Sequence, residues 1–185
     1  PWATSLIIQA GVWKFIIDKD YGALNTLLMK LHIIASPVNW TPTPGAYFAW
    51  ECFVGIFVTV PFVTFCVLSG LQSIDTAYYE AATVDGANYW QKLFKITLPL
   101  VRPSLTVSTV LNIIYVFNSF PIIWTITKGD PASRTDTLVT YLYKLAFYKG
   151  KSGEAAAVSV IGFLILCACA SVYMVISLKK EGQEE

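Results

Sequence analysis

The amino-acid sequence predicts an all-α fold, a polytopic transmembrane helical bundle. Of its 185 residues, 55% are hydrophobic and 14% are charged, whereas soluble domains carry about 25% charged residues. The charges are also clustered, because the stretch 46–71 carries only one and the stretches 105–126 and 155–178 carry none. Lipid offers no partner for backbone N–H and C=O groups, so long apolar stretches must form helices.

Each of these three stretches is long enough for the roughly 20 apolar residues that cross a hydrocarbon core. We therefore expect three full spans, at about 46–71, 105–126 and 155–178. The segment 1–17 is apolar except for Gln9 and Lys14. We expect it to form most of a further span, in a chain that lacks an N-terminal part; a buried helix that does not cross the membrane is the alternative.

Residues 18–45 contain several turn formers, and between them leucines recur at helical spacing, at positions 24, 27, 28 and 31. This spacing predicts a short amphipathic helix at the membrane interface.

Residues 73–102 are predicted to form a loop of two short helices around a turn. Asp75 is a plausible N-cap for the first helix. Asp85-Gly86 is a turn dipeptide in which glycine supplies positive φ. Apolar side chains then repeat at helical spacing (Trp90, Leu93, Phe94, Thr97), and Pro99 is expected to end the second helix.

This loop resembles a known family in its sequence. Glu80-Ala81-Ala82 with Gly86, followed by Phe94-Lys95-Ile96-Thr97-Leu98-Pro99, resembles the EAA loop of type I ABC importer permeases. Thr127-Lys128-Gly129-Asp130-Pro131 is similar to the Thr-x-Gly-Gly-Pro of the sugar-transporting branch, with Asp130 departing from the second glycine. The resemblance covers essentially the whole chain.

The resemblance implies a bacterial inner-membrane permease subunit of a binding-protein-dependent importer for a sugar. It implies three kinds of protein partner: a pair of ABC ATPase subunits, a second permease that forms a heterodimer with this chain, and an extracytoplasmic solute-binding protein. The loop would dock into a cleft of the ATPase through six residues: Glu80, Ala81, Ala82, Asp85, Gly86 and Phe94.

ATP would be bound and hydrolysed by the partner. The chain has no Gly-x-x-x-x-Gly-Lys-Ser/Thr loop to cradle phosphates, so we expect no cofactor and no enzymatic activity.

The distribution of positive charge conflicts with the orientation that the resemblance implies. Lys and Arg are more numerous on the side opposite the loop, with eight residues there against five on the loop side. The positive-inside rule alone would place residues 73–102 outside the cell. The resemblance places them in the cytoplasm, and we expect that orientation.

Polar side chains inside a span are costly and usually face a cavity or another helix. Ser108, Asn112, Tyr115 and Ser119 fall on one helical face, and Pro121 is expected to kink that helix. Amides, hydroxyls and aromatic rings suit a sugar, and the resemblance adds residues of the neighbouring spans. The predicted substrate pathway contains Trp2, Phe57, Thr59, Phe62, Asn112, Tyr115, Asn118 and Ser119. Ordinary packing between helices is the alternative.

Other residues indicate no further chemistry. Glu51 is expected to be an interfacial or paired carboxylate rather than a substrate ligand. All four cysteines lie in apolar stretches and the single histidine is distant in sequence, so no metal site is expected. A net charge of +1 without a basic cluster suggests no nucleic-acid partner. Two other functions remain as alternatives: import of a polyol or glycerol phosphate, and a membrane scaffold or enzyme subunit without a transport role.

Overall fold

The computed structural model describes residues 3–130 and 133–181, and these residues form helices joined by turns and loops, without a strand. The expectation of an all-α fold is confirmed. The chain divides into two compact units, one of Pro1–Thr59 with Val116–Phe163 and the other of Val60–Tyr115 with Leu164–Glu185.

Within the described residues, three helical stretches are long and apolar enough to cross a membrane: Pro44–Gln72, Tyr89–Phe117 and Ser152–Ser177. The first is α3 (Pro44–Gln72), and the third belongs to α9 (Ser152–Glu181). The second joins α5 (Tyr89–Lys92), the π-helical turn η1 (Leu93–Thr97) and α6 (Leu98–Phe117). A 29-residue helix rises about 43 Å at 1.5 Å per residue, more than the roughly 30 Å of a hydrocarbon core.

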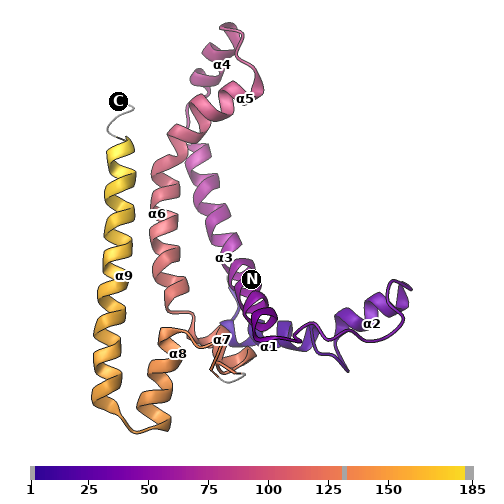
Figure 1. The fold of residues 1–185 in the computed structure, drawn as a ribbon. Helices are drawn as coiled ribbons and strands as arrows, with labels where there is room; N and C mark the ends of the chain where they lie inside the picture. The colour runs from indigo at the N-terminus through magenta and orange to yellow at the C-terminus, as the bar shows by residue number, and fades with distance from the viewer. Residues whose placement is uncertain (1–2, 131–132, 182–185) are drawn as a thin grey trace. The chain divides into compact units, whose positions relative to one another are not determined.

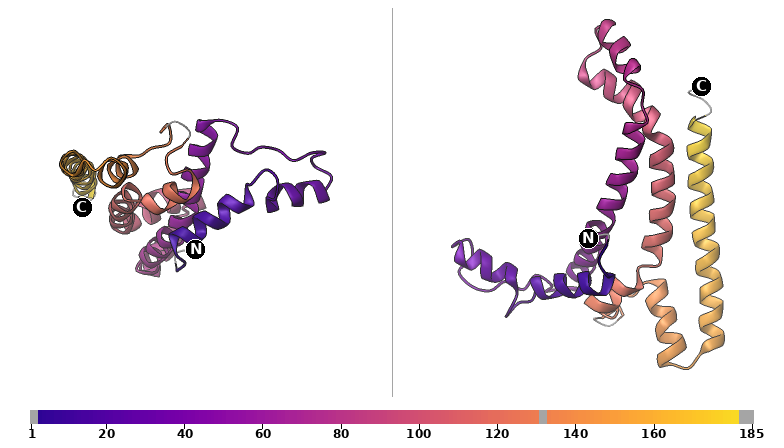
Figure 2. Two further views of the ribbon diagram at one scale, coloured as in Figure 1. Left: turned by 90° about the horizontal axis from the view of Figure 1, so that it is seen from below. Right: turned by 180° about the vertical axis from the view of Figure 1, so that it is seen from behind.

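The predicted span over 1–17 is wrong for the described part of that segment. Helix α1 covers only Leu6–Ile16, 11 residues, about half the length that a span requires. Instead α1 packs against α7 (Phe120–Ile126), and the two helices lie side by side in Figure 2. Ala10 of α1 and Ile122, Ile123 and Ile126 of α7 are buried. Because Ile8, Val12 and Phe15 are exposed, the alternative of a buried helix holds only for the side of α1 that faces α7.

The predicted single helix over 105–126 is also wrong. Helix α6 ends at Phe117, and α7 begins at Phe120 after Ser119, whose ψ of 43° is not helical. Pro121 lies in the first turn of α7, where its missing N–H costs nothing because the first four N–H groups of a helix have no internal partner. The proline therefore starts a new helix rather than kinking an existing one.

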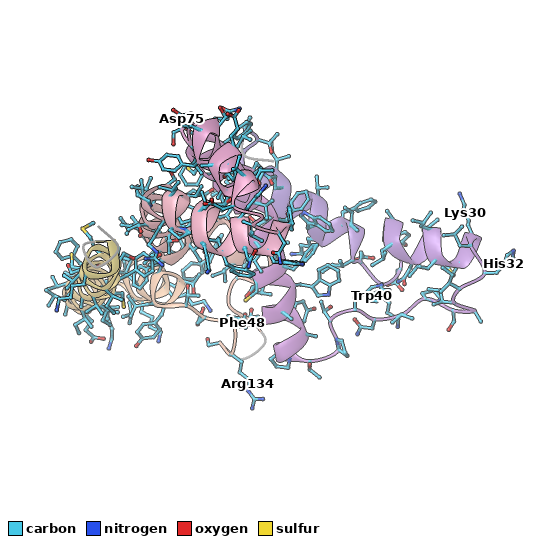
Figure 3. The ribbon with its side chains drawn as sticks, turned by 90° about the horizontal axis from the view of Figure 1, so that it is seen from above. Lys30, His32, Trp40, Phe48, Asp75 and Arg134 are labelled. Atoms are coloured by element: carbon cyan, nitrogen blue, oxygen red, sulfur yellow. The ribbon has the colours of Figure 1, made fainter. Side chains whose placement is uncertain are left out.

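A short helix in 18–45 is confirmed as α2 (Ala23–Lys30), and its location at the membrane interface stays a prediction. It belongs to an arm whose far end carries Lys30 and His32, while Trp40 lies nearer to α3 (Figure 3). The arm is fastened by Asn25, which is 2% exposed. Its amide donates to the carbonyls of Lys19 and Val38 and accepts from the Val38 N–H and the Trp40 indole.

Two further elements lead into α9. Helix α8 (Leu138–Tyr143) starts with a capping box made by Thr137 and Thr140, and η2 (Lys144–Tyr148) is a second π-helical turn. Lys144 of this turn forms an ion pair of 2.9 Å with Asp136, which ties the turn to the loop that precedes α8.

Candidate functional site

The first candidate site is the loop that follows α3. Helix α4 (Thr76–Val84) begins at Asp75, whose carboxylate accepts the Ala77 N–H at 2.9 Å, so the predicted N-cap is confirmed. Gly86 has a φ of +77°, as the turn prediction requires. Asn88 then caps α5 with a capping box that includes Gln91. In Figure 1 the helices α4 and α5 lie on either side of this turn.

Two side-chain contacts hold α4 against the α5–η1 segment, and a third braces that segment internally. Lys92 Nζ donates to Thr83 Oγ1 at 2.7 Å, and the Tyr79 and Thr97 hydroxyls are 2.9 Å apart. Thr97 also donates to the Lys92 carbonyl at 3.3 Å. The two contacts between the helices link residues 9 and 18 positions apart in the chain. Sequence reasoning missed them, although they fix the angle between the two helices.

The predicted coupling residues are displayed on this helix pair. Glu80 and Ala81 are exposed on α4, Ala82 is half-buried, and Asp85 and Gly86 are exposed at the turn. Phe94, on η1, is 61% exposed and stacks on Trp90, with ring centroids 6.1 Å apart. The arrangement is a braced, exposed surface with acidic and aromatic side chains.

Pro99 does not end the second loop helix, contrary to the prediction. The chain passes from α5 through η1 into α6, and Leu98 donates its N–H to the carbonyl of Leu93. This i→i+5 bond widens the turn just before the proline, which relieves the clash that a proline ring makes in a regular helix. The loop and the following apolar helix are therefore one continuous element.

The second candidate site is the predicted substrate pathway, and its residues fall in both compact units. In the first unit, Thr59 of α3 and Ser119, the N-cap residue of α7, line one cavity of about 350 Å³. Phe57 lies on α3 with its ring edge-on to Trp13, centroids 5.2 Å apart. Asn118 is exposed in the break between α6 and α7. Trp2 lies outside the described residues.

The remaining predicted pathway residues belong to the second unit. Phe62 is half-buried on α3, and Asn112 and Tyr115 are half-buried on α6. Asn112 donates to the Ser108 carbonyl at 2.9 Å, and its Oδ1 is a buried acceptor without a protein partner among the described residues. Because α6 ends at Phe117, the expected stripe from Ser108 to Ser119 is not one helical face.

Glu51, expected to be an interfacial or paired carboxylate rather than a substrate ligand, is held by a hydrogen bond and not by an ion pair within the described residues. Glu51 is 5% exposed, and no ion pair joins it to a Lys or Arg of the described residues. Its Oε1 accepts a short hydrogen bond of 2.6 Å from the Thr127 hydroxyl. Glu51 is the only charged residue in 46–71. Because intramembrane carboxylates are costly, this position was the sequence signal for a buried, hydrogen-bonded carboxylate.

The comparisons with known proteins agree with this architecture. Residues 4–180 match the family described as "Binding-protein-dependent transport system inner membrane component". A probable ABC transporter permease protein of Brucella suis is 48% identical over 98% of this chain and 63% of its own length. The trehalose/maltose transport system permease protein MalF of Thermococcus litoralis is 36% identical over 94% of this chain and 58% of its own length.

Among solved structures, a bacterial alginate ABC transporter in complex with an alginate pentasaccharide-bound periplasmic protein is similar in fold. The TM-score is 0.84 at 24% sequence identity, covering 98% of this chain and 62% of that one. The chain thus spans about three fifths of the length of these two relatives. These relatives are transport components rather than enzymes. The chain belongs to the family of inner membrane components of binding-protein-dependent transport systems.

Proposed function

We propose that this chain is part of the transmembrane permease subunit of an ABC importer that carries a sugar across the bacterial inner membrane. The observation that carries the proposal is the α4–α5 helix pair, which is exposed, capped at both helix starts and braced by side-chain contacts. A partner subunit can displace such a pair while the angle between its two helices stays fixed. The proposed partner is a separate ABC ATPase that binds and hydrolyses ATP.

The continuity of the second long helix supports a lever mechanism. Helix α5 runs through η1 into α6, the helix that carries Asn112 and Tyr115. When the ATPases close on nucleotide, a displacement of the loop would be transmitted along this helix to those side chains. Motion of helix bundles around a central site is how alternating access generally proceeds.

Two observations support a sugar as the transported solute. The cavity near α7 offers the hydroxyls of Thr59 and Ser119. Separately, the ring of Phe57, which does not line that cavity, is 39% exposed. Hydroxyls can bind sugar hydroxyls, and an aromatic ring can stack on the C–H face of a sugar. The relatives of this chain include the trehalose/maltose permease of Thermococcus litoralis and a diacetylchitobiose uptake system permease of Streptomyces coelicolor.

The complete transporter would contain a second permease that pairs with this chain, two ATPase subunits and an extracytoplasmic solute-binding protein. The family description, which specifies dependence on a binding protein, supports the last of these. Selection of the solute would then be shared between the binding protein and the permease pathway.

Charge reversal at Glu80 tests the coupling role. Glu80→Lys should abolish both co-purification of the ATPase and ATP-dependent uptake, because a cation would replace the carboxylate that meets a basic group of the ATPase. Uptake of labelled sugars into membrane vesicles and a pull-down of the assembled complex measure the two effects. A panel that includes a polyol and glycerol phosphate identifies the solute class.

Asp20→Lys is the matched control, since Asp20 is also an exposed acidic residue but lies in the arm before α2. This variant should insert, assemble and transport like the wild type. Normal uptake by a membrane-inserted Glu80→Lys variant would contradict the coupling assignment.

A further inference from the structure

Glu51 lies at a junction between α3 and the segment that follows α7. The Thr127 hydroxyl that donates to Glu51 Oε1 also accepts the Gly129 N–H at 3.0 Å. Thr135, 1% exposed, lies 3.0 Å from the Thr127 hydroxyl and donates to the Asp130 carbonyl. One carboxylate oxygen is therefore fixed by a network that is complete without any solute.

The other carboxylate oxygen is not satisfied. Glu51 Oε2 is buried and has no hydrogen-bond partner among the described residues. A buried carboxylate that lacks a cation and a full set of donors is strongly disfavoured. A group that brings hydrogen-bond donors without negative charge would relieve this cost.

The place from which such a group would come is the cavity beside Glu51. Glu51 contributes to the wall of the cavity of about 350 Å³ that Thr59 and Ser119 also line. The rest of its wall is largely apolar, with Ile56, Ile122 and Ile123 among the contributors. Apolar walls with a few placed polar groups are typical of small-molecule sites.

We propose that Glu51 is a specificity-determining residue of this cavity, which accepts a hydrogen bond from a hydroxyl of a neutral sugar and excludes anionic sugars. The proposal rests on the proposed function and narrows its solute class. Glu51 Oε2 supplies the acceptor, and the apolar wall supports the C–H face of the ring. A uronate carboxylate in the same place would face the Glu51 carboxylate at short range.

The exclusion follows from electrostatics at low dielectric. Like charges brought together at a desolvated site cost several kcal/mol, and specificity commonly uses such a repulsive element beside the attractive one.

The test compares solute pairs rather than single solutes. The full-length permease, assembled with its partner subunits in proteoliposomes, is offered neutral disaccharides, each paired with its glucuronate-terminated counterpart. In Glu51→Gln, which keeps the size and an acceptor but removes the charge, the neutral-to-uronate uptake ratio should fall about tenfold or more. The wild-type and Glu51→Gln transporters are assembled with the same solute-binding protein. A change in the neutral-to-uronate uptake ratio therefore comes from the permease.

Two matched variants separate recognition from structural support. Glu51→Asp retains the charge and should keep the wild-type ratio. Thr127→Val removes the hydroxyl that holds Oε1 but leaves the carboxylate, and should lower total uptake without changing the ratio. An unchanged ratio in Glu51→Gln, whatever its total uptake, overturns the inference and leaves the proposed function intact. A wild-type complex that takes up no neutral sugar overturns both.

Discussion

Single buried polar side chains hold the irregular parts of this protein together. Asn25 shows this most clearly, since its amide uses both N–H donors and accepts two further hydrogen bonds. The groups it joins lie between Lys19 and Trp40, so a single side chain closes the arm around α2. Few apolar side chains of the arm are buried. The hydrogen bonds of the Asn25 amide are therefore the main contacts that hold the arm together.

Replacing Asn25 by Ala should loosen the arm. A fully buried polar group left without a partner costs about 1–3 kcal/mol. The groups that Asn25 bonds are part-buried, so each should cost less, and the arm should open locally while the long helices stay inserted. Limited proteolysis of the reconstituted protein should show faster cleavage within residues 18–40.

Asn39→Ala provides the comparison, because Asn39 is exposed and its side chain accepts only local bonds from Thr41. This variant should be cleaved at the wild-type rate. Equal cleavage of the Asn25 and Asn39 variants would show that other contacts hold the arm.

Polar residues that act on groups nearby in the chain could be predicted from the sequence, whereas hydrogen bonds between residues far apart in the chain could not. Asp75 and Gly86 act on groups within a few residues, and both were predicted from residue type and position. The partner of Glu51 is 76 residues away, and Asn25 bonds residues 13 and 15 positions away. No periodicity or turn rule relates such pairs, since only the folded chain brings them together.

The prolines show where sequence reasoning fails for whole helices. Pro99 and Pro121 each occupy the second position of a helical segment, α6 and α7. At Pro99 the preceding helix continues through a π turn, and at Pro121 the chain breaks at Ser119. The proline rules predict a helix end at Pro99 and a kink at Pro121, and neither occurs. Near Pro99, the Tyr79–Thr97 hydrogen bond joins residues 18 positions apart, a tertiary contact that no proline rule includes.

Within the loop, the geometry of the turn should matter as much as its charges. Gly86→Val places a β-branched residue at a φ of +77°, a region that costs an ordinary residue about 1–2 kcal/mol. The two loop helices should lose their fixed angle, and the rate of ATP hydrolysis should no longer follow the rate of uptake. Parallel assays of both rates in proteoliposomes measure this uncoupling.

Gly86→Asn is the matched control, because asparagine tolerates the left-handed region. It should preserve coupling nearly at the wild-type level. If the valine variant couples ATP hydrolysis to uptake normally, the turn geometry does not contribute to the transmission.

At the scale of the whole molecule, the number of long apolar helices was predictable but their orientation was not. Three such helices are present within the described residues, as the clustering of charges indicates. The count of Lys and Arg and the family resemblance imply opposite orientations. The contacts within the described residues are the same whichever side of the membrane the loop faces. The orientation of the loop is therefore measured directly.

Cysteine accessibility decides the orientation. Val84, at the end of α4, is 89% exposed, and Arg134 is exposed in the segment before α8. The long helix Tyr89–Phe117 lies between them in the chain, so the two positions should face opposite sides. With the four native cysteines replaced by serine, an impermeant maleimide should label Arg134→Cys in intact spheroplasts. It should label Val84→Cys only in inside-out vesicles. The cysteine-free protein should stay unlabelled in both. Labelling of Val84→Cys in intact spheroplasts would place the loop outside the cell, beyond the reach of any cytoplasmic ATPase.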